Sequence, residues 1–500
     1  MRLTFPRHFV LAALLLFSAH PAFAAAPPAE LLRAADLQAD VAVLEQAYTQ
    51  LHPGLHRYNT PKRMAQHFRD LRRELDHDQP LAEAYLAFSR FAAKVRCGHT
   101  YANFHNQPER IAAALFRSDN RVPFRFRWLG RRMVITKNLS TDPSLVPGTE
   151  ILAIEGVPVG RILDRLMTVA RADGHNDAKR RADLEITGAD RLAAFDIYLP
   201  LFFPQVDTRH TLRVRSPGNR TARTVDVPAL THAQRLADLD LPAGADAPVF
   251  AVRDVGNDAV LLDMPTWALY DSRWDWRGFL RDTFRDLLAR GTQTLVIDLR
   301  RNEGGLGVGD VILAHLVDRP IAMPGYRRLL RYRETPQSLR PYLDTWDRSF
   351  HDWGAAARDI DDSAFLQLVR EGEAADGDIV VPEAPRFTGR VYALVGATNS
   401  SATFEFARAL HDSGLGTLVG QTTGGNRRGI NGGAFFFLRL PRSGIELDLP
   451  LVGQFPSTPQ PDAGIDPDLR TSPTPADIAA GRDVELEAAL ADARRRRAPT

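Results

Sequence analysis

Two adjacent serines lie where an apolar segment gives way to a helical pattern. Residues 391–395 are apolar and β-prone, and Asn399, Ser400, Ser401 and Ala402 follow them just before a helix-forming run. The first N–H groups of a helix have no partner inside the helix, so a serine at such a turn has hydrogen-bond donors beside its hydroxyl. This position suits either a nucleophile with its oxyanion donors or a simple helix cap. On the serines alone, we favour the cap.

A second polar segment follows the β-prone residues 294–298. It begins with Asp298, continues through Arg300, Asn302 and Glu303, and ends in Gly304 and Gly305. Glycine lets the backbone approach a substrate closely and leaves N–H groups free to donate. The alternative is an ordinary strand-to-helix loop. A phosphate-binding loop is disfavoured because no Lys-Ser/Thr pair follows the glycines.

A histidine near the end of a helical segment is the candidate proton acceptor. His99 stands between Gly98 and Thr100, and its ordinary pKa near 6.5 suits a general base. A lone histidine is more often structural, and His52, His56 and His411 compete with it. No H-E-x-x-H motif occurs and Cys97 is the only cysteine, so we expect no metal and no cofactor.

The elements that must position these residues change character along the chain. Residues 29–95 have helical apolar spacing, and we expect helices near 37–51, 64–75 and 81–95. Residues 120–230 contain strand patterns at 122–128, 133–136, 211–215 and 224–227, with a helix near 161–170. From residue 248 strands and helices alternate, which predicts a layered α/β sheet with strands at 259–263, 294–298, 391–395 and 417–419. Residues 325–385 are polar and irregular, so we expect an insertion or lid there.

The first residues resemble an export signal. Arg2 and Arg7 precede an apolar run, and an Ala-Phe-Ala segment ends at residue 24, which predicts a cleaved signal peptide over residues 1–24. The formal net charge of +2 comes from these two arginines, so the remaining chain is formally neutral. It has no excess of positive charge with which to bind nucleic acid. No other segment has transmembrane length. We expect a soluble exported protein, periplasmic or secreted, whose oligomeric state the sequence leaves open.

Taken together, these segments resemble peptidase family S41, the tail-specific or C-terminal-processing serine proteases and their tricorn-like relatives. Residues 295–305 are similar to the family's D-x-R-x-N-x-G-G segment, and residues 398–402 to its nucleophile segment. Residues 420–426 and 464–468 are similar to its G-E-x-T-x-G-K and G-x-E-P-D segments. Residues 147–158 resemble part of a PDZ-like domain.

The resemblance implies an α/β fold: a crotonase/ClpP-like catalytic core with an N-terminal helical domain and a PDZ-like β-rich domain. The corresponding boundaries are 29–105 for the helical domain, 118–230 for the PDZ-like domain, 245–480 for the catalytic domain and 481–500 for a C-terminal helix and tail. The partner is then a peptide or protein substrate, and a PDZ-like domain would bind it as an added strand.

The same resemblance assigns roles to the site residues. Ser401 would be the nucleophile, with Ser400 as the alternative, and the N–H groups of Ala402 and of Gly304 or Gly305 would form the oxyanion hole. Tail-specific members use a lysine base where this chain has Asn426, whose amide cannot accept the proton. Tricorn-like members use a histidine, which His99 matches, although they carry a hydroxyl residue where this chain has Gly98. Asp466 or Asp462 would orient the imidazole, while Asp298, Arg300, Asn302 and Asn426 would shape the site loops.

The sequence therefore predicts an exported serine-type endopeptidase that acts through an acyl-enzyme intermediate. Two alternatives stay open on the same scaffold. One is a catalytically inactive peptide- or ligand-binding protein, and the other is a hydrolase of a small acyl substrate.

Overall fold

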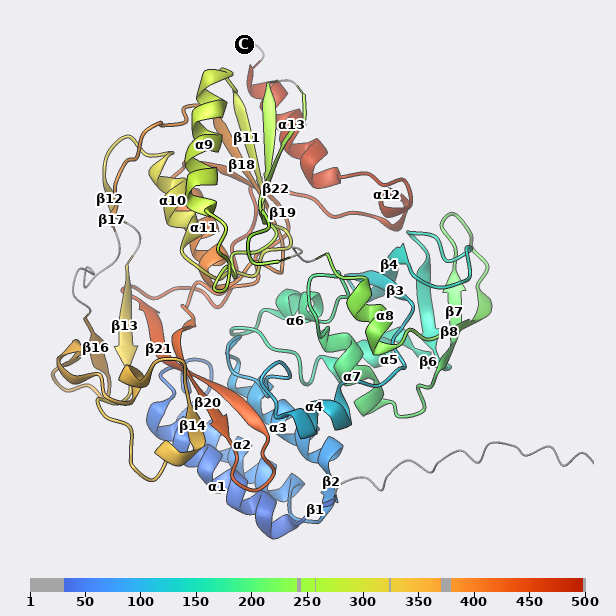
Figure 1. Cartoon of the computed structure of the whole chain (residues 1–500), viewed down its shortest axis with the longest axis vertical. Coiled ribbons are helices and arrows are strands. Elements are labelled where there is room, and N and C mark those ends of the chain that lie inside the picture. The colour runs from blue at the N-terminus through green and yellow to red at the C-terminus, as the bar shows by residue number, and fades with distance from the viewer. Residues whose placement is uncertain (1–30, 241–243, 257, 323–324, 370–378, 498–500) are drawn as a thin grey trace, which may run out of the picture.

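The chain folds into sheets and helices of a mixed α/β architecture, as the sequence predicts (Figure 1). This computed structural model describes residues 31–240, 244–256, 258–322, 325–369 and 379–497, and within them the strands form three six-stranded sheets and two small ones. The signal peptide predicted for residues 1–24 lies outside the described residues. None of the helices in the described part is long and apolar enough to cross a membrane.

Three helices form the N-terminal part, and all three match the predicted helices. They are α1 (Ala34–Leu51), α2 (Pro61–Glu74) and α3 (Leu81–Val95), and the two-residue strands β1 (Leu31–Leu32) and β2 (Gln79–Pro80) pair beside them. The apolar stripe of α1 is fully buried and consists of Leu37, Val41, Leu44, Tyr48 and Leu51. Thr60 caps α2 by accepting a hydrogen bond from the backbone of Arg63, and Pro61 occupies the first turn, where it removes no helical bond.

An antiparallel sheet and five short helices make up the middle of the chain. The strands are β3 (Phe124–Leu129), β4 (Arg132–Asn138), β5 (Glu150–Ile154), β6 (Val157–Pro158), β7 (Arg209–Arg215) and β8 (Arg223–Pro228). The helices are α4 (Glu109–Leu115), α5 (Val159–Leu166), α6 (Asp177–Asp183), α7 (Ala194–Phe202) and α8 (His232–Ala237). Alternate residues of β7 are buried, as expected for a sheet with one face on a core.

The core sheet has the order β22-β19-β18-β11-β10-β9, and all its pairs are parallel except the edge strand β9. The strands are β9 (Ala251–Asp254), β10 (Ala259–Asp263), β11 (Thr294–Asp298), β18 (Arg390–Val395), β19 (Thr417–Gly420) and β22 (Leu469–Arg470). The helices are α9 (Trp276–Ala289), α10 (Val308–Ala314), α11 (Ser401–Asp412), α12 (Pro475–Ala479) and α13 (Val484–Arg497).

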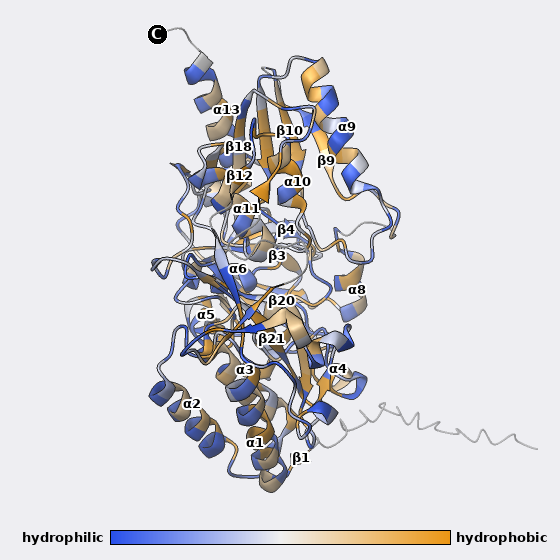
Figure 2. Ribbon diagram, turned by 90° about the vertical axis from the view of Figure 1, so that its left-hand side faces the viewer, coloured by the Kyte–Doolittle hydropathy of each residue, from blue (hydrophilic) through white to orange (hydrophobic). Residues whose placement is uncertain are grey.

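Helices cover both faces of the core sheet (Figures 1 and 2). Leu295 and Ile297 of β11 pack with α9, α10 and α11, whereas the intervening Val296 packs with Ala489 and Ala493 of α13. Strands buried on both faces carry the near-continuous apolar runs from which the sequence pattern predicted them. In a parallel sheet the carboxyl ends of neighbouring strands lie along one edge, so the loops after β11 and β18 lie side by side.

A third sheet contains much of the segment expected to be a lid. Its order is β14-β20-β21-β13-β16-β15, from β13 (Tyr326–Leu330), β14 (Leu343–Asp344), β15 (Ala357–Asp359), β16 (Leu366–Leu368), β20 (Asn431–Arg439) and β21 (Glu446–Pro456). Shorter pieces are β12 (Ile321–Ala322), β17 (Ile379–Val380), η1 (Arg340–Tyr342), η2 (Arg348–His351) and η3 (Gly354–Ala356). Leu330, Leu339 and Phe350 from this segment share a core with α1 and α3, so most of it is integral to a sheet and is not irregular. Residues 370–378 lie outside the described part.

Arg300 anchors the loop after β11 to the C-terminal helix. Its guanidinium binds both carboxylate oxygens of Asp298, at 2.9 and 2.6 Å, and both of Asp483, at 2.7 and 2.9 Å. Glu485 adds a contact at 3.3 Å. Burial alone would lower the pKa of Arg300, but these carboxylates raise it above its usual range. The loop that carries Gly304 is thereby fixed to the helix that covers the other face of the sheet.

We expect Arg300→Met to lower the free energy of unfolding by about 2 kcal/mol, because it leaves three carboxylates close together without a cation. Arg301→Met is the matched control, since the Arg301 side chain is 43% exposed and meets Asp263 only at 3.3 Å. The control is expected to change stability by less than about 0.5 kcal/mol. Urea unfolding followed by circular dichroism measures both, and equal effects of the two substitutions would contradict this role for Arg300.

Candidate active site

The two serines occupy different environments at the start of α11. Ser400 is the N-cap residue, is 6% exposed, and donates its hydroxyl hydrogen to the backbone oxygen of Glu303 at 3.2 Å. Ser401 is partly exposed and has a φ of +50°, a left-handed conformation that costs a non-glycine residue roughly 1–2 kcal/mol. Such strain at a strand-to-helix turn is typical of an exposed nucleophile.

The glycine-rich loop lies directly against Ser401. A Cβ on Gly304 would lie 2.9 Å from the Ser401 Cβ, and one on Gly305 would lie 2.1 Å from the Trp267 backbone. Both glycines also have positive φ, +125° and +137°. Only glycine therefore allows this approach. The N–H of Gly304 already donates to the Asn302 side-chain oxygen at 3.0 Å.

Two buried asparagines lock the serine loop and the glycine loop together. The Asn399 amide donates to the backbone oxygens of Leu299 and, at 2.9 Å, of Asn302. Its side-chain oxygen accepts from Gly396, and its backbone oxygen accepts from Gly424 and Gly425. The Asn302 side chain donates to the backbone oxygen of Met264, and its oxygen also accepts from the Thr403 hydroxyl.

His99 lies on the loop that follows α3. The loop turns at Arg96, whose φ is +61°, and the His99 ring is half-buried against Phe435, with ring centroids 5.8 Å apart. The Nδ1 atom of His99 is buried and has no hydrogen-bond partner among the described residues. Burial lowers the pKa of His99, and the nearby Asp173 carboxylate opposes that shift. A neutral imidazole at neutral pH is the form that accepts a proton.

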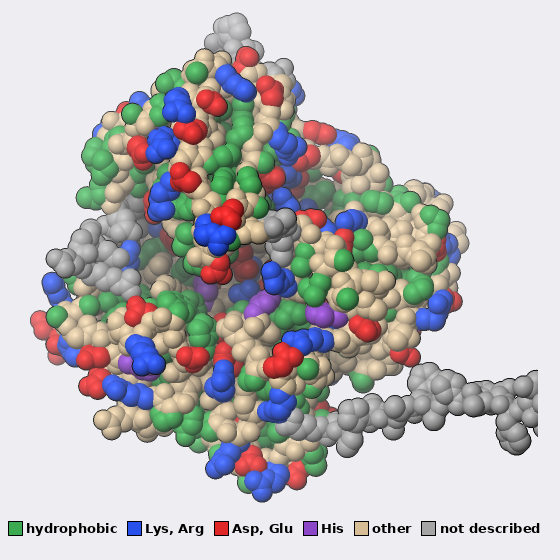
Figure 3. Space-filling model, in the orientation of Figure 1, with side chains coloured by type: hydrophobic (Ala, Val, Ile, Leu, Met, Phe, Trp, Pro, Cys, Tyr) green, Lys and Arg blue, Asp and Glu red, His purple; other side chains and the backbone are tan. Residues whose placement is uncertain are grey.

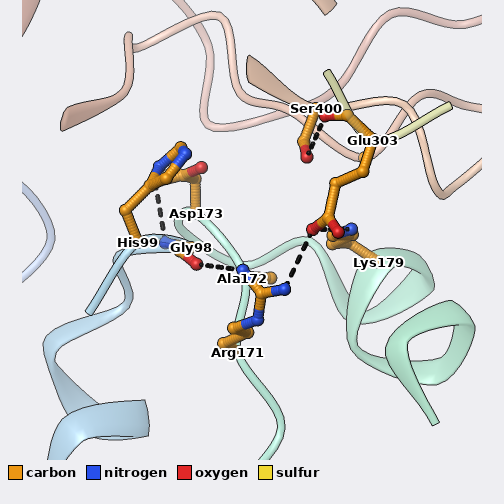
Figure 4. A pocket seen from close by; sticks show the side chains of 9 residues that line it. Gly98, His99, Arg171, Ala172, Asp173, Lys179, Glu303 and Ser400 are labelled. Atoms are coloured by element: carbon orange, nitrogen blue, oxygen red, sulfur yellow. Dashed lines mark hydrogen bonds and ion pairs between the residues drawn. The ribbon is translucent and has the colours of Figure 1, made fainter. Parts of the chain in front are cut away.

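His99 and Ser400 line one small pocket (Figure 4). The other lining residues include Arg171, Asp173, Lys179 and Glu303. The space-filling view shows a hollow between the part of the molecule that carries the core sheet and the parts below it, with charged and histidine side chains at its edge (Figure 3). In this arrangement no hydrogen bond joins His99 to either serine among the described residues.

Glu303 is held by two cations from the segment between α5 and α6 and from α6 itself. Its carboxylate meets Lys179 at 2.7 Å and Arg171 at 3.1 Å. Burial alone would raise the pKa of Glu303, but Arg171 and Lys179 hold it well below its usual range. Arg171 also donates to the backbone oxygen of Gly98, and Lys179 to that of Thr398. These two side chains connect the histidine, glycine and serine loops.

The aspartates expected to orient His99 lie elsewhere. Asp462 binds the ring and the backbone N–H of His175 and the Asn426 amide, and Asp466 binds Thr422 and Arg470. The carboxylates that line the pocket with His99 are instead Asp173 and Glu303.

Asn426 is fully buried, and its amide donates to Asp462 and to the backbone oxygen of Asp173. Its side-chain oxygen accepts from the backbone of Arg428 at 2.9 Å, so the position aligned with lysine holds the neighbouring loops together.

No sequence pattern predicts that residues 171–179 contribute to this site. They carry no recognisable motif and join the predicted β-rich region to the site only through tertiary contacts. The one signal was the high density of charged residues from Arg171 to Arg181, which is equally typical of a solvated helix.

Comparison with known proteins gives matches in family and in structure. A family model described as peptidase family S41 matches residues 259–438. No curated protein matches the chain.

Mature CPAF complexed with lactacystin aligns with a TM-score of 0.59 and 16% identity, covering 92% of this chain and 97% of that one. A serine-to-alanine mutant of CPAF gives a TM-score of 0.62 at 14% identity, covering 93% and 99%. The photosystem II D1 C-terminal processing protease gives a TM-score of 0.40 at 15% identity, covering 88% of this chain and 93% of that one.

The CPAF structures are too distant in sequence to show more than a shared fold over nearly the whole of both chains. The family model covers β10 to β20, which includes the serine loop and the glycine loop. The predicted resemblance to peptidase family S41 is thereby confirmed over residues 259–438, and the chain is a serine-type peptidase.

Proposed function

We propose that the protein is an exported endopeptidase in which Ser401 attacks the scissile carbonyl and His99 is the general base. The observation that carries this proposal is the strained Ser401, held against the glycine loop beside the pocket of His99. The substrate is a peptide or protein, and the reaction needs no cofactor.

Ser401 is the better nucleophile of the two serines for three reasons. Its backbone is in the strained left-handed region, its side chain is the more exposed, and its Cβ is the atom closest to the position of a Gly304 Cβ. Ser400 instead engages its hydroxyl with Glu303. Ser400 lines the pocket of His99, and this observation favours Ser400 as the alternative nucleophile.

Acylation would begin when Ser401 Oγ forms a bond to the carbonyl carbon while its proton passes to His99. The oxygen of the tetrahedral intermediate would accept hydrogen bonds from Ala402 and Gly305, because the N–H of Gly304 is already engaged with Asn302. His99 then returns the proton to the leaving amine, and water hydrolyses the acyl-enzyme by the reverse sequence. Hydrogen bonds between base and nucleophile are often long without substrate and shorten when it binds.

We further propose that the antiparallel sheet from β3 to β8 is a PDZ-like unit that binds an extended peptide as an added strand. A short connection, residues 171–176, joins this region to the site and contacts the loops of Gly98, Thr423 and Asp462. Export through the leader over residues 1–24 would place the enzyme in the periplasm or outside the cell.

Ser401→Ala is expected to reduce cleavage of a fluorescent casein substrate by at least about 10⁴-fold, because it removes the nucleophile. Ser400→Ala is expected to cost far less, since it removes only one hydrogen bond to Glu303. Ser413→Ala, at the exposed end of the same helix, is the control and is expected to retain wild-type activity. If Ser400→Ala reduced cleavage more than Ser401→Ala, Ser400 would be the nucleophile.

The acid limb of kcat/KM is expected to have its midpoint below pH 6.5, because burial lowers the pKa of His99 from 6.5 and the neutral imidazole is the active form. Activity should therefore rise with pH through that midpoint. His77→Gln, on an exposed histidine, should leave the limb unchanged. A limb centred well above pH 7, or one that persists in His99→Ala, would exclude His99 as the base.

A further inference from the structure

A buried carboxylate faces the His99 loop from the segment after α5. Asp173 is 2% exposed and lines the pocket with His99, and its Oδ1 accepts a hydrogen bond from the Gly98 backbone at 3.0 Å. The close view draws this carboxylate beside the His99 ring (Figure 4). The backbone around it is also fixed, because Gly174 donates to Arg96 and the Asn426 amide donates to the Asp173 oxygen.

Gly98 has no side chain because Asp173 occupies the space. A Cβ added at Gly98 would lie 2.9 Å from Asp173 Oδ2 and 3.5 Å from its Cγ. The backbone of Gly98 is not in the left-handed region, so nothing except this carboxylate requires glycine there. The sequence departs from the tricorn-like pattern at this same residue, where a hydroxyl side chain is expected before the histidine.

The charges around His99 leave Asp173 as the available carboxylate. Four charged groups face the imidazole: Asp173, Glu303, Arg171 and Lys179. Glu303 is bound by both cations. Asp173 Oδ1 is bound by Gly98, whereas Oδ2 points toward the position of the missing side chain. The Nδ1 atom of His99 is buried and no described residue is its hydrogen-bond partner, whereas a buried N–H of this kind normally has an acceptor.

We propose that Asp173 is the positioning residue of His99: its carboxylate accepts a hydrogen bond from His99 Nδ1–H when substrate is bound, and it fills the place of the hydroxyl side chain that Gly98 lacks. This holds the tautomer in which Nε2 is free to take the serine proton and stabilises the imidazolium that forms. The site is then completed by a residue from outside the part of the chain that the family model matches. This inference rests on the proposed role of His99.

The test is the pH dependence of inactivation by a fluorophosphonate probe, which needs no known substrate. Asp173→Asn keeps the shape and an oxygen for Gly98 but removes the charge. We expect the second-order inactivation rate to fall by about 10²–10⁴-fold. The acid limb should also move to lower pH, because loss of a neighbouring negative charge lowers the pKa of an imidazolium. Asp177→Asn, on a 63% exposed carboxylate of the same segment, is the control and should leave both quantities unchanged.

Gly98→Ala gives an independent test, because it displaces the carboxylate without removing it. We expect it to slow inactivation in the wild-type background and to cause much less additional loss in an Asp173→Ala background, where the space is empty. If Asp173→Asn does not fold, the role of Asp173 is tested by comparing the loss that Gly98→Ala causes in the wild-type background with the loss that it causes in the Asp173→Ala background.

Two outcomes separate the two hypotheses. Inactivation that requires His99 but keeps the wild-type rate and pH limb in Asp173→Asn would overturn the role of Asp173 alone. Inactivation that survives in His99→Ala would overturn the proposed function on which this role rests.

Discussion

The side chain of Asn399 holds together the loops on which the site is built. It bonds to the backbone of Leu299 and Asn302 on one side and to Gly396 on the other, and its own backbone oxygen receives Gly424 and Gly425. A fully buried amide with this many partners cannot be replaced by a group of another shape without leaving polar atoms unpaired. Because parallel strands place these loops along one edge of the sheet, a single residue can reach all of them. The strain at Ser401 is maintained by this network and by the close approach of Gly304.

His99 lies at this edge of the core sheet although it belongs to another part of the chain, the N-terminal helical part. Residues 171–179 make the connection. Asp173 binds the Gly98 backbone, Arg171 and Lys179 bind Glu303, and Asn176 donates to the backbone of Thr423 and Gly425. The serine loop and the histidine loop are therefore both contacted by one segment that leaves the antiparallel sheet. If binding of a peptide shifted that sheet, the shift would reach both the serine loop and the histidine loop through this segment. This is a physical reason for such a connection in a peptidase.

The sequence predicted the regular elements well, because their apolar spacing is local. The helix expected at residues 81–95 is α3, and the strands expected at 259–263 and 294–298 are β10 and β11. The sequence did not predict the third sheet, in which the short strands β13 and β14 pair with β21 and β20, far along the chain. The serine, glycine and histidine loops were found from their residue types. Asp173 was not, because no spacing along a chain shows which carboxylate will face a given histidine, and for the same reason the sequence left Asp466 and Asp462 as alternatives.

The most direct test of the account is peptide mapping by mass spectrometry after reaction with a fluorophosphonate at a pH above the acid limb. The account predicts one phosphonyl adduct per chain, located on Ser401, formed rapidly by the wild type and slowed by orders of magnitude in His99→Ala. An adduct on any other residue, or an adduct on Ser401 whose rate does not depend on His99, would contradict it.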